Sequence, residues 1–330
     1  MATPHHPRRG STGYYPRVRK KGLRADVRSW PELDGKPSVE GFAGYKVGMT
    51  HVEMVDYRKY STTAGQSIVS AATVVEVPPL KVLGIRYYGD DYRGKVTIGE
   101  TWADNIPKEL NRRIPVRKEK NDKQMDTGIV SDVRMIVCTN PNEITGLPKK
   151  VPDIFELPVT GNTVKEKEDY VKSFLGKDIS FSEFSAPGKF VDVIAVTKGK
   201  GFQGSVKRFG VKLLSHKNRK HRRMIGTLGP WHPDWVRNTV PQAGQVGSHQ
   251  RTAHNIRVLH FGTKNDTGSI NVKGGFLSYG LVRNDYVLLH GSIPGPSKRL
   301  IKMRVASRQQ VPDSSSMSLS YISLESKQGD

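Results

Sequence analysis

The segment 197–204, TKGKGFQG, has the glycine spacing G-x-G-x-x-G directly after a strand-like run, a pattern that can hold the pyrophosphate of a dinucleotide. A dinucleotide-binding turn must open a sustained helix and be followed by an acid about twenty residues later. Here Gly210 interrupts the stretch that would have to form the helix, and where the acid is required, residues 217–223 are the basic run KNRKHRR. The glycines are better explained by close approach of the backbone to phosphates, with basic side chains beside them: Lys198, Lys200, Lys207 and Arg208.

Histidines and carboxylates are the other residues that could do chemistry. His216 and His221 are five residues apart, as are His249 and His254, so neither pair shares a helical face. The single cysteine, Cys138, excludes a disulfide framework and argues against zinc. Acids in residues 89–170 alternate with bases, as on a solvated surface. The sequence therefore predicts no catalytic site, no metal site and no cofactor, and a protein that is not an enzyme.

The charge of the chain is its strongest signal. It has 330 residues with 53 Lys+Arg against 31 Asp+Glu, a net charge of +22, which favours a polyanionic partner. Residues 1–36 have 9 Lys/Arg and 3 acids, and residues 197–257 have 13 Lys/Arg and a single acid, Asp234. These two segments hold 18 of the 22 excess charges.

Aromatic residues interrupt the basic segment 197–257, at Phe202, Phe209, Trp231 and Trp235. Cations that pair with phosphates, interleaved with aromatics, suit unstacked RNA bases better than a solvated loop. Because the segment repels itself, we expect it to be largely disordered until an anion neutralises it. As a hairpin-like arm it could reach at most ~100 Å. We predict an RNA-binding arm.

The elements that must position these residues are mostly strands. Runs rich in β-branched residues and bounded by Gly or Pro predict strands at 39–45, 67–77, 81–88, 133–139, 191–197, 256–261, 286–291 and 299–305. Thr163 followed by Glu166 has capping-box spacing and predicts a helix over 164–175. Strands on both sides of two interruptions predict one sheet domain that carries two insertions, a mainly β protein. The predicted parts are a basic extension (1–37), the sheet domain (38–88, 187–196 and 258–306), an inserted α/β lobe (89–186), the basic arm (197–257) and a Ser-rich, surface-draped or mobile tail (307–330).

Membrane and secretion signals are lacking in the sequence. No window approaches eighteen apolar residues, and no apolar segment follows the basic residues of the amino terminus. We expect a soluble, intracellular protein.

Five ordered blocks carry a resemblance to a known family. They are residues 41–50 (GFAGYKVGMT), 196–204 with 206–210 (VTKGKGFQG and VKRFG), 226–233 (GTLGPWHP), 243–252 (AGQVGSHQRT) and 290–296 (HGSIPGP). Through them, nearly the whole chain resembles the universal large-subunit ribosomal proteins of the L-three family, in its archaeal and eukaryotic form.

The resemblance implies a six-stranded barrel like the second domain of translation elongation factors, with an inserted α/β lobe and long, non-globular basic extensions. It implies a structural constituent of the cytoplasmic ribosome that assembles early on large-subunit (23S-type) rRNA, near its 3′ domain. The arm would carry Trp231 at its tip, toward the peptidyl-transferase centre. Expected neighbours resemble the L-fourteen and L-thirteen proteins; no homo-oligomer or membrane is expected, and Mg²⁺ or other ions would enter only through rRNA. Some eukaryotic relatives carry a modified histidine where this chain has Arg219, so no modification is expected.

Phosphate pairing by arginine and lysine and stacking by aromatics define the expected rRNA-binding residues. These are Arg8, Arg9, Arg17, Arg19, Lys20, Lys21, Arg24, Arg28, Trp30, Lys198, Lys200, Phe202, Lys207, Arg208, Lys212, Lys217, Arg219, Lys220, His221, Arg222, Arg223, Trp231, His232, Arg237, His249, Arg251, His254 and Arg257.

Two other functions remain open at this point. One is a nucleotide-dependent RNA-modifying enzyme that uses the glycine loop. The other is a barrel-type translation factor that cycles on and off the ribosome.

Overall fold

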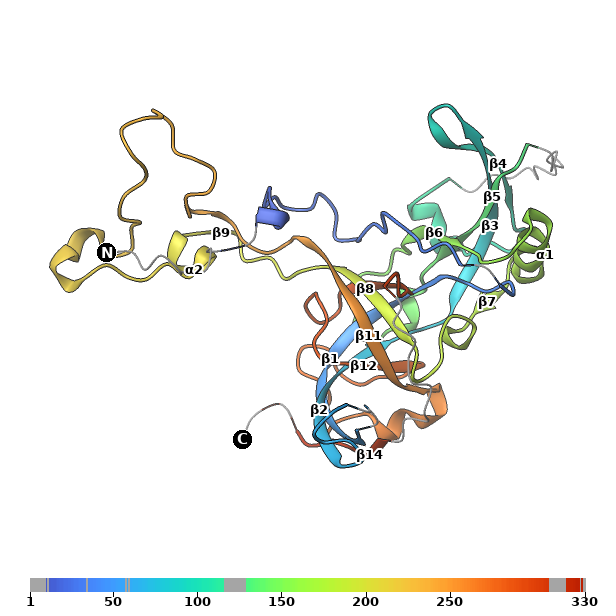
Figure 1. The fold of residues 1–330 in the computed structure, drawn as a ribbon. Coiled ribbons are helices and arrows are strands. Elements are labelled where there is room, and N and C mark those ends of the chain that lie inside the picture. The colour runs from blue at the N-terminus through green and yellow to red at the C-terminus, as the bar shows by residue number, and fades with distance from the viewer. Residues whose placement is uncertain are drawn as a thin grey trace. The chain divides into compact units, whose positions relative to one another are not determined.

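The computed structural model describes residues 10, 12–33, 35–56, 58, 60–115, 129–308, 319–326 and 328 (Figure 1). The chain divides into two compact units. The first unit comprises residues up to Leu23 together with Val196–Arg251, and the second comprises Arg24–Ala195 and Thr252–Asp330. Strands far outnumber helices among the described residues, so the predicted mainly β class is confirmed.

Six strands form a closed ring of pairings, in the order β13-β8-β11-β12-β2-β1 and back to β13. The first residues of β1 pair with β13, from Gly41 opposite Arg304, and from Tyr45 onward β1 pairs with β2 on its other side. No edge is left open around this ring, which removes the unpaired backbone groups that a sheet edge exposes. The ring strands are β1 (Gly41–Val55), β2 (Ser67–Glu76), β8 (Phe190–Val196), β11 (Gln250–Gly262), β12 (Tyr286–His290) and β13 (Leu300–Val305).

Glycine is required where β1 changes partners. A Cβ on Gly44 would lie 2.7 Å from the carbonyl oxygen of Glu76, which real Cβ atoms do not tolerate. The neighbouring Phe42 is fully buried and packs edge-on against Phe181 at 5.5 Å between ring centroids. Burying each such side chain contributes roughly 1.5–3 kcal/mol. The first half of β1 therefore contributes to the large core of the second unit.

A second sheet lies in the same unit. Its strand order is β4-β3-β5-β6, and β7 pairs with β3. Its elements are β3 (Leu80–Asp91), β4 (Gly94–Trp102), β5 (Asp132–Cys138), β6 (Ile154–Pro158) and β7 (Asp178–Ile179).

The insertion begins earlier than predicted. The strand over 81–88 was placed in the sheet domain, with the lobe starting at residue 89, whereas β3 pairs with β4, β5 and β7 in the second sheet. The alternation of side chains within a strand predicts that a strand forms but not which strand it pairs with.

Helix α1 (Val164–Phe174) confirms the predicted helix and its start. Thr163 Oγ1 accepts a hydrogen bond from Glu166 N at 3.3 Å, as the capping-box spacing predicts. The return contact differs from the standard box, because Glu166 Oε2 accepts from Asn162 N at 3.3 Å. Val171 is fully buried, so the helix packs against the sheet through one side.

Part of the described tail forms a strand beside the ring. Strand β14 (Leu319–Ile322) pairs with the end of β1, and Thr50 Oγ1 donates to Ser323 O at 2.8 Å. Residues 319–322 are half-buried or exposed, so this part of the tail lies on the surface as a strand, and residues 309–318 lie outside the described residues. Short 3₁₀ turns occur at Thr12–Tyr14, Lys108–Arg112, Pro141–Glu143, Phe181–Glu183, His216–His221 and Lys264–Ser269.

The predicted basic extension 1–37 is divided between the two units. From residue 24 onward it packs on the second unit: Ala25 is buried, and Trp30 packs against the core. The Arg304 guanidinium donates to Ser29 O. Across the described residues, no helix is both long and apolar enough to cross a bilayer.

Candidate nucleic-acid interface

The base of the basic arm is built around the glycine loop. Strands β9 (Phe202–Gln203) and β10 (Gly244–Gln245) pair, and Lys200 N donates to Val246 O at 2.9 Å. Helix α2 (Ser205–Phe209) follows and ends at Gly210, whose φ of +65° favours glycine. A helix this short confirms that the loop does not open the sustained helix of a dinucleotide-binding fold.

Arg208 ties the two sides of this base together. Its guanidinium donates to Gln242 O at 3.0 Å and to Gln245 O at 3.2 Å. Arg208 therefore joins the segments that lead into and out of the arm, besides its predicted role in phosphate binding.

The amino-terminal segment packs on the same base, within the first unit. Lys20 N donates to Ser248 O at 2.8 Å, and His249 Nδ1 donates to Val18 O at 2.8 Å. The Arg17 guanidinium lies 4.4 Å from the centroid of the Phe209 ring. Two segments that are more than 180 residues apart in the sequence therefore form one basic structure.

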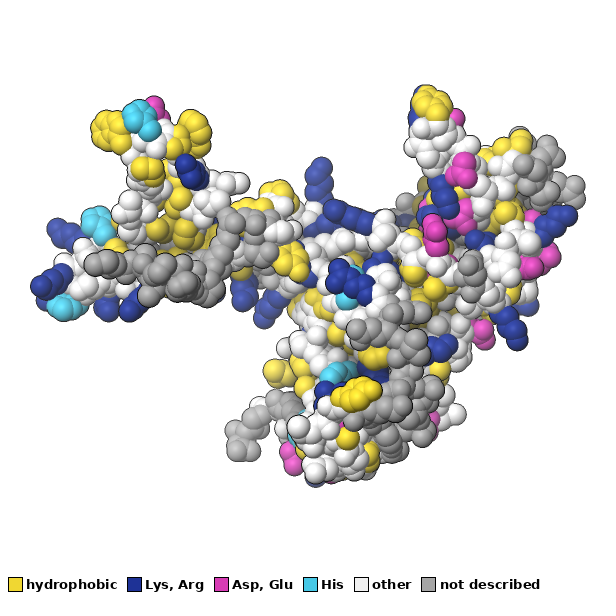
Figure 2. Space-filling model, viewed as in Figure 1, with side chains coloured by type: hydrophobic (Ala, Val, Ile, Leu, Met, Phe, Trp, Pro, Cys, Tyr) yellow, Lys and Arg dark blue, Asp and Glu magenta, His cyan; other side chains and the backbone are white. Residues whose placement is uncertain are grey.

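Beyond this base, residues 212–239 form a segment that we call the arm loop (Figure 1). All of its side chains are exposed except Leu214, Ile225 and Pro233. Trp231 is 87 % exposed and Trp235 is 70 % exposed. Figure 2 shows hydrophobic side chains on this surface among Lys, Arg and His. Large aromatics left in water within a basic segment mark a binding surface rather than a core.

The first unit has almost no internal counter-charge. Its described residues include 16 Lys/Arg and one carboxylate, Asp234, which lies 3.4 Å from the exposed His232. An excess of this size repels itself and can be neutralised only by an anion from outside the unit.

Comparison with known proteins identifies the family. The sequence profile of the family "Ribosomal protein L3" matches residues 1–329. The chain belongs to the ribosomal protein L3 family. It is 63 % identical over 330 residues to the large ribosomal subunit protein uL3 of Picrophilus torridus, and the match covers the whole of both chains. The uL3 proteins of Thermoplasma acidophilum and Thermoplasma volcanium are each 62 % identical over 332 residues, again covering both chains fully. The predicted L-three resemblance is confirmed.

The predicted rRNA-binding residues of this L3-family chain fall into four groups. Arg8 and Arg9 lie outside the described residues. Five are half-buried and make contacts within the first unit: Arg17, Lys20, Arg208, His249 and Arg251. Five belong to the second unit: Arg24, Arg28, Trp30, His254 and Arg257. The others are exposed on the first unit: Arg19, Lys21, Lys198, Lys200, Phe202, Lys207, Lys212, Lys217, Arg219, Lys220, His221, Arg222, Arg223, Trp231, His232 and Arg237.

His254, which is predicted to bind rRNA, has a partner within the second unit. Its Nδ1 lies 3.0 Å from Asp192 Oδ2, and Arg304 Nη2 donates to the same oxygen at 2.9 Å. Burial raises the pKa of Asp192, but hydrogen bonds from Asn255 N, Arg304 and Ser307 outweigh it and lower the pKa below its ordinary value. The sequence places His254 in a basic arm, whereas the structure places it in ring strand β11.

Two aromatics were not among the predicted site residues. Trp235 interrupts the basic segment in the same way as Trp231 and is nearly as exposed, so the interleaving of aromatics with cations was sufficient to find it. Tyr14 lies under the Arg251 guanidinium, 4.6 Å from its ring centroid, and no local pattern predicts that long-range contact. Within the described ranges, no three His, Cys, Asp or Glu side chains gather as a metal site would require.

Proposed function

We propose that this chain is a structural, non-catalytic constituent of the large ribosomal subunit that binds 23S-type rRNA through its first unit. The observation that carries the proposal is the combination, among the described residues of the first unit, of 16 Lys/Arg with one carboxylate and two exposed tryptophans. Family membership and relatives named as large ribosomal subunit proteins support it.

The binding mechanism has no chemical step. Exposed lysines and arginines of the arm loop displace counterions from phosphates, and Trp231 and Trp235 stack on unpaired bases. Half-buried cations such as Arg17 and Arg208 hold the base of the arm in shape, so the exposed ones are presented together. Specificity comes from the shape of folded RNA rather than from a linear base code.

The finer parts of the proposal rest on the family resemblance. They are early assembly near the 3′ domain of the rRNA, Trp231 at the arm tip directed toward the peptidyl-transferase centre, and neighbours that resemble the L-fourteen and L-thirteen proteins. The likeness of the closed ring to the second domain of elongation factors also belongs here, as do the cytoplasmic location and the absence of a resident cofactor.

Sedimentation of ribosomal subunits tests the proposed function. Cell extract is washed at increasing salt, and the chain is quantified in the large-subunit peak. We expect one copy per large subunit that persists through a high-salt wash. Release into the soluble fraction at moderate salt would instead identify a visiting translation factor. Saturable binding of a dinucleotide or methyl donor, lost in Gly201→Val, would identify an enzyme.

A further inference from the structure

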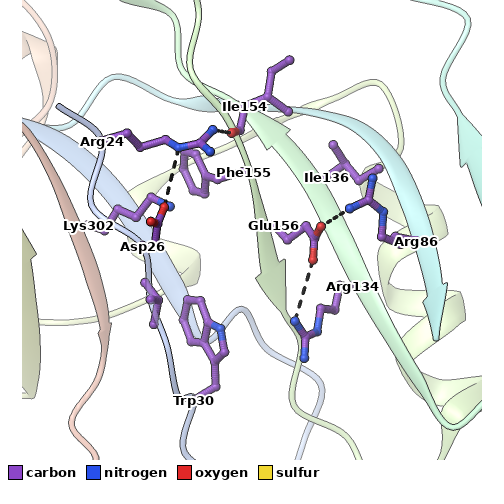
Figure 3. Close-up of a pocket in the computed structure, with 11 residues that line it drawn as sticks. Arg24, Asp26, Trp30, Arg86, Arg134, Ile136, Ile154, Phe155, Glu156 and Lys302 are labelled. Carbon is purple, nitrogen blue, oxygen red and sulfur yellow. Dashed lines mark hydrogen bonds and ion pairs between the residues drawn. The ribbon is translucent and has the colours of Figure 1, made fainter. Parts of the chain in front are cut away.

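A cavity of about 340 Å³ lies within the second unit. Its walls come from the amino-terminal segment, the second sheet and ring strand β13. In Figure 3, Arg24, Asp26 and Lys302 lie on one side, and Arg86, Arg134 and Glu156 on the other.

Lys302 is the unusual member of this lining. Only 7 % of it is exposed, and its Nζ lies 4.5 Å from the centroid of the Phe155 ring. The aromatic face replaces only part of the hydration of a buried ammonium, so an acceptor that enters the cavity stabilises its charge.

The carboxylates of the cavity are committed to other cations. Glu156 accepts from the Arg86 guanidinium and from Tyr88 Oη at 2.6 Å, and it lies 3.7 Å from Arg134 Nη1. Asp26 lies 4.0 Å from Arg24 Nε, which is too long for a hydrogen bond, and Arg24 Nη1 donates to Ile154 O. Four cations and two carboxylates face the space, so the lining is net positive.

We propose that this cavity binds one phosphate group, with the Lys302 ammonium and the Arg24 guanidinium as its donors. A tetrahedral phosphate offers acceptors in several directions, which fits donors that approach from separate elements. The volume lies at the lower end of the range for ligand sites and admits the phosphate with part of the molecule that carries it. If the proposed function holds, the phosphate belongs to the rRNA backbone, and otherwise it is a free anion.

The charge state of Lys302 agrees with this ligand. Burial, followed by the nearby Arg24, lowers the pKa of Lys302 to about 8. The ammonium therefore keeps its proton at pH 7, and an anion beside it raises the pKa again.

Nuclear magnetic resonance of the full chain labelled with [¹³Cε]lysine tests the site. The Lys302 signal is assigned by its loss in Lys302→Met, and inorganic phosphate or a 5′-phosphorylated tetranucleotide is titrated in. We expect a saturable shift of this signal and a rise in its pKa on binding. Arg24→Gln weakens the binding about tenfold, the loss of one charge-assisted donor. Lys165→Met, which removes an exposed lysine of helix α1, leaves it unchanged.

The outcomes separate the site from the proposed function. Tighter binding of the tetranucleotide than of phosphate identifies RNA as the source, and the reverse identifies a free anion. An unmoved Lys302 signal, while arm lysines still respond to the tetranucleotide, overturns the inference and leaves the proposed function standing. If the Lys302 signal shifts saturably while the arm lysines do not respond to the tetranucleotide, the inference stands and the proposed function is overturned. An acidic peptide that displaces phosphate and binds more tightly also overturns the inference.

Discussion

Basic residues have two different roles in this chain: some bond to backbone carbonyls, and others are exposed. Arg208 donates to carbonyls of residues 242 and 245, whereas Arg223 of the arm loop is exposed. The sequence predicted one phosphate-binding role for both, because side-chain type and local charge are the same. Only the fold brings carbonyls from more than thirty residues away to Arg208. Residue types were therefore sufficient to locate the interface. The tertiary structure was needed to tell the cations that bond to the protein from those that are exposed.

Trp231→Ala is expected to leave the protein as stable as before and to weaken RNA binding by about 1–3 kcal/mol, because an exposed ring loses stacking but no packing. Thermal unfolding and the affinity for large-subunit rRNA are measured together. Trp30→Ala is the matched control. Its ring packs against the core, so it should lower the unfolding temperature instead. Equal RNA affinity of Trp231→Ala and the wild type, with an unchanged peptide-bond rate on reconstituted subunits, would count against stacking.

Glu40→Gln is expected to stabilise the protein at pH 8 by about 1–3 kcal/mol and to change nothing at pH 4. Burial raises the pKa of Glu40 from 4.5 to about 7, and Glu40 Oε2 has no hydrogen-bond partner in the described structure. The folded state therefore binds the proton more tightly, so the stability that Glu40 contributes is complete below pH 4.5 and is lost as the pH rises through 7. Urea unfolding at both pH values measures the difference. Exposed Glu183→Gln is the control, and an equal gain there would refute the assignment.

At the scale of elements, the arm loop is separable from the base of the arm. Removal of residues 212–239 with a short Gly-Ser bridge keeps Arg208 and its carbonyl partners at 242 and 245. A longer deletion of 199–256 would also remove the first half of β11 and the His254 contact to Asp192. We expect the short deletion to retain the unfolding transition of the second unit and to block incorporation into large subunits. Its normal incorporation would show that the arm loop is dispensable.

The sequence predicted eight of the strands and helix α1, because the strands are runs rich in β-branched residues between Gly or Pro and the helix follows a cap. It did not predict β4, whose residues are mostly exposed and so lack a buried face. Strands β7 and β14 are too short for a pattern to appear. The candidate nucleic-acid interface was likewise predictable only where its residues form a local sequence pattern. The charge excess and the aromatics were visible in the sequence, whereas the cavity beside Lys302 depends on three elements that meet only in the fold.

At the scale of the whole molecule, charge is concentrated in one unit. We expect the logarithm of the RNA affinity of the full chain to fall with the logarithm of salt concentration at a slope of roughly −7 to −9, if about ten phosphates are engaged. The deletion of 212–239, which removes Lys212, Lys217, Arg219, Lys220, Arg222, Arg223 and Arg237, should make this slope shallower by several units. Affinities measured by fluorescence anisotropy between 50 mM and 400 mM salt give both slopes. Identical slopes would place the phosphate contacts elsewhere on the chain.

Closure of the ring by β13 sets an order of events during synthesis. Strand β1 lies near residue 41, and the strand that joins it to β8 lies at residues 300–305. During synthesis from the amino terminus, the whole arm emerges before its anchoring strands can be locked together. A nascent chain therefore presents a cationic, unanchored polypeptide to any nucleic acid nearby, and the interval before residue 305 appears is when a protective chaperone would matter most.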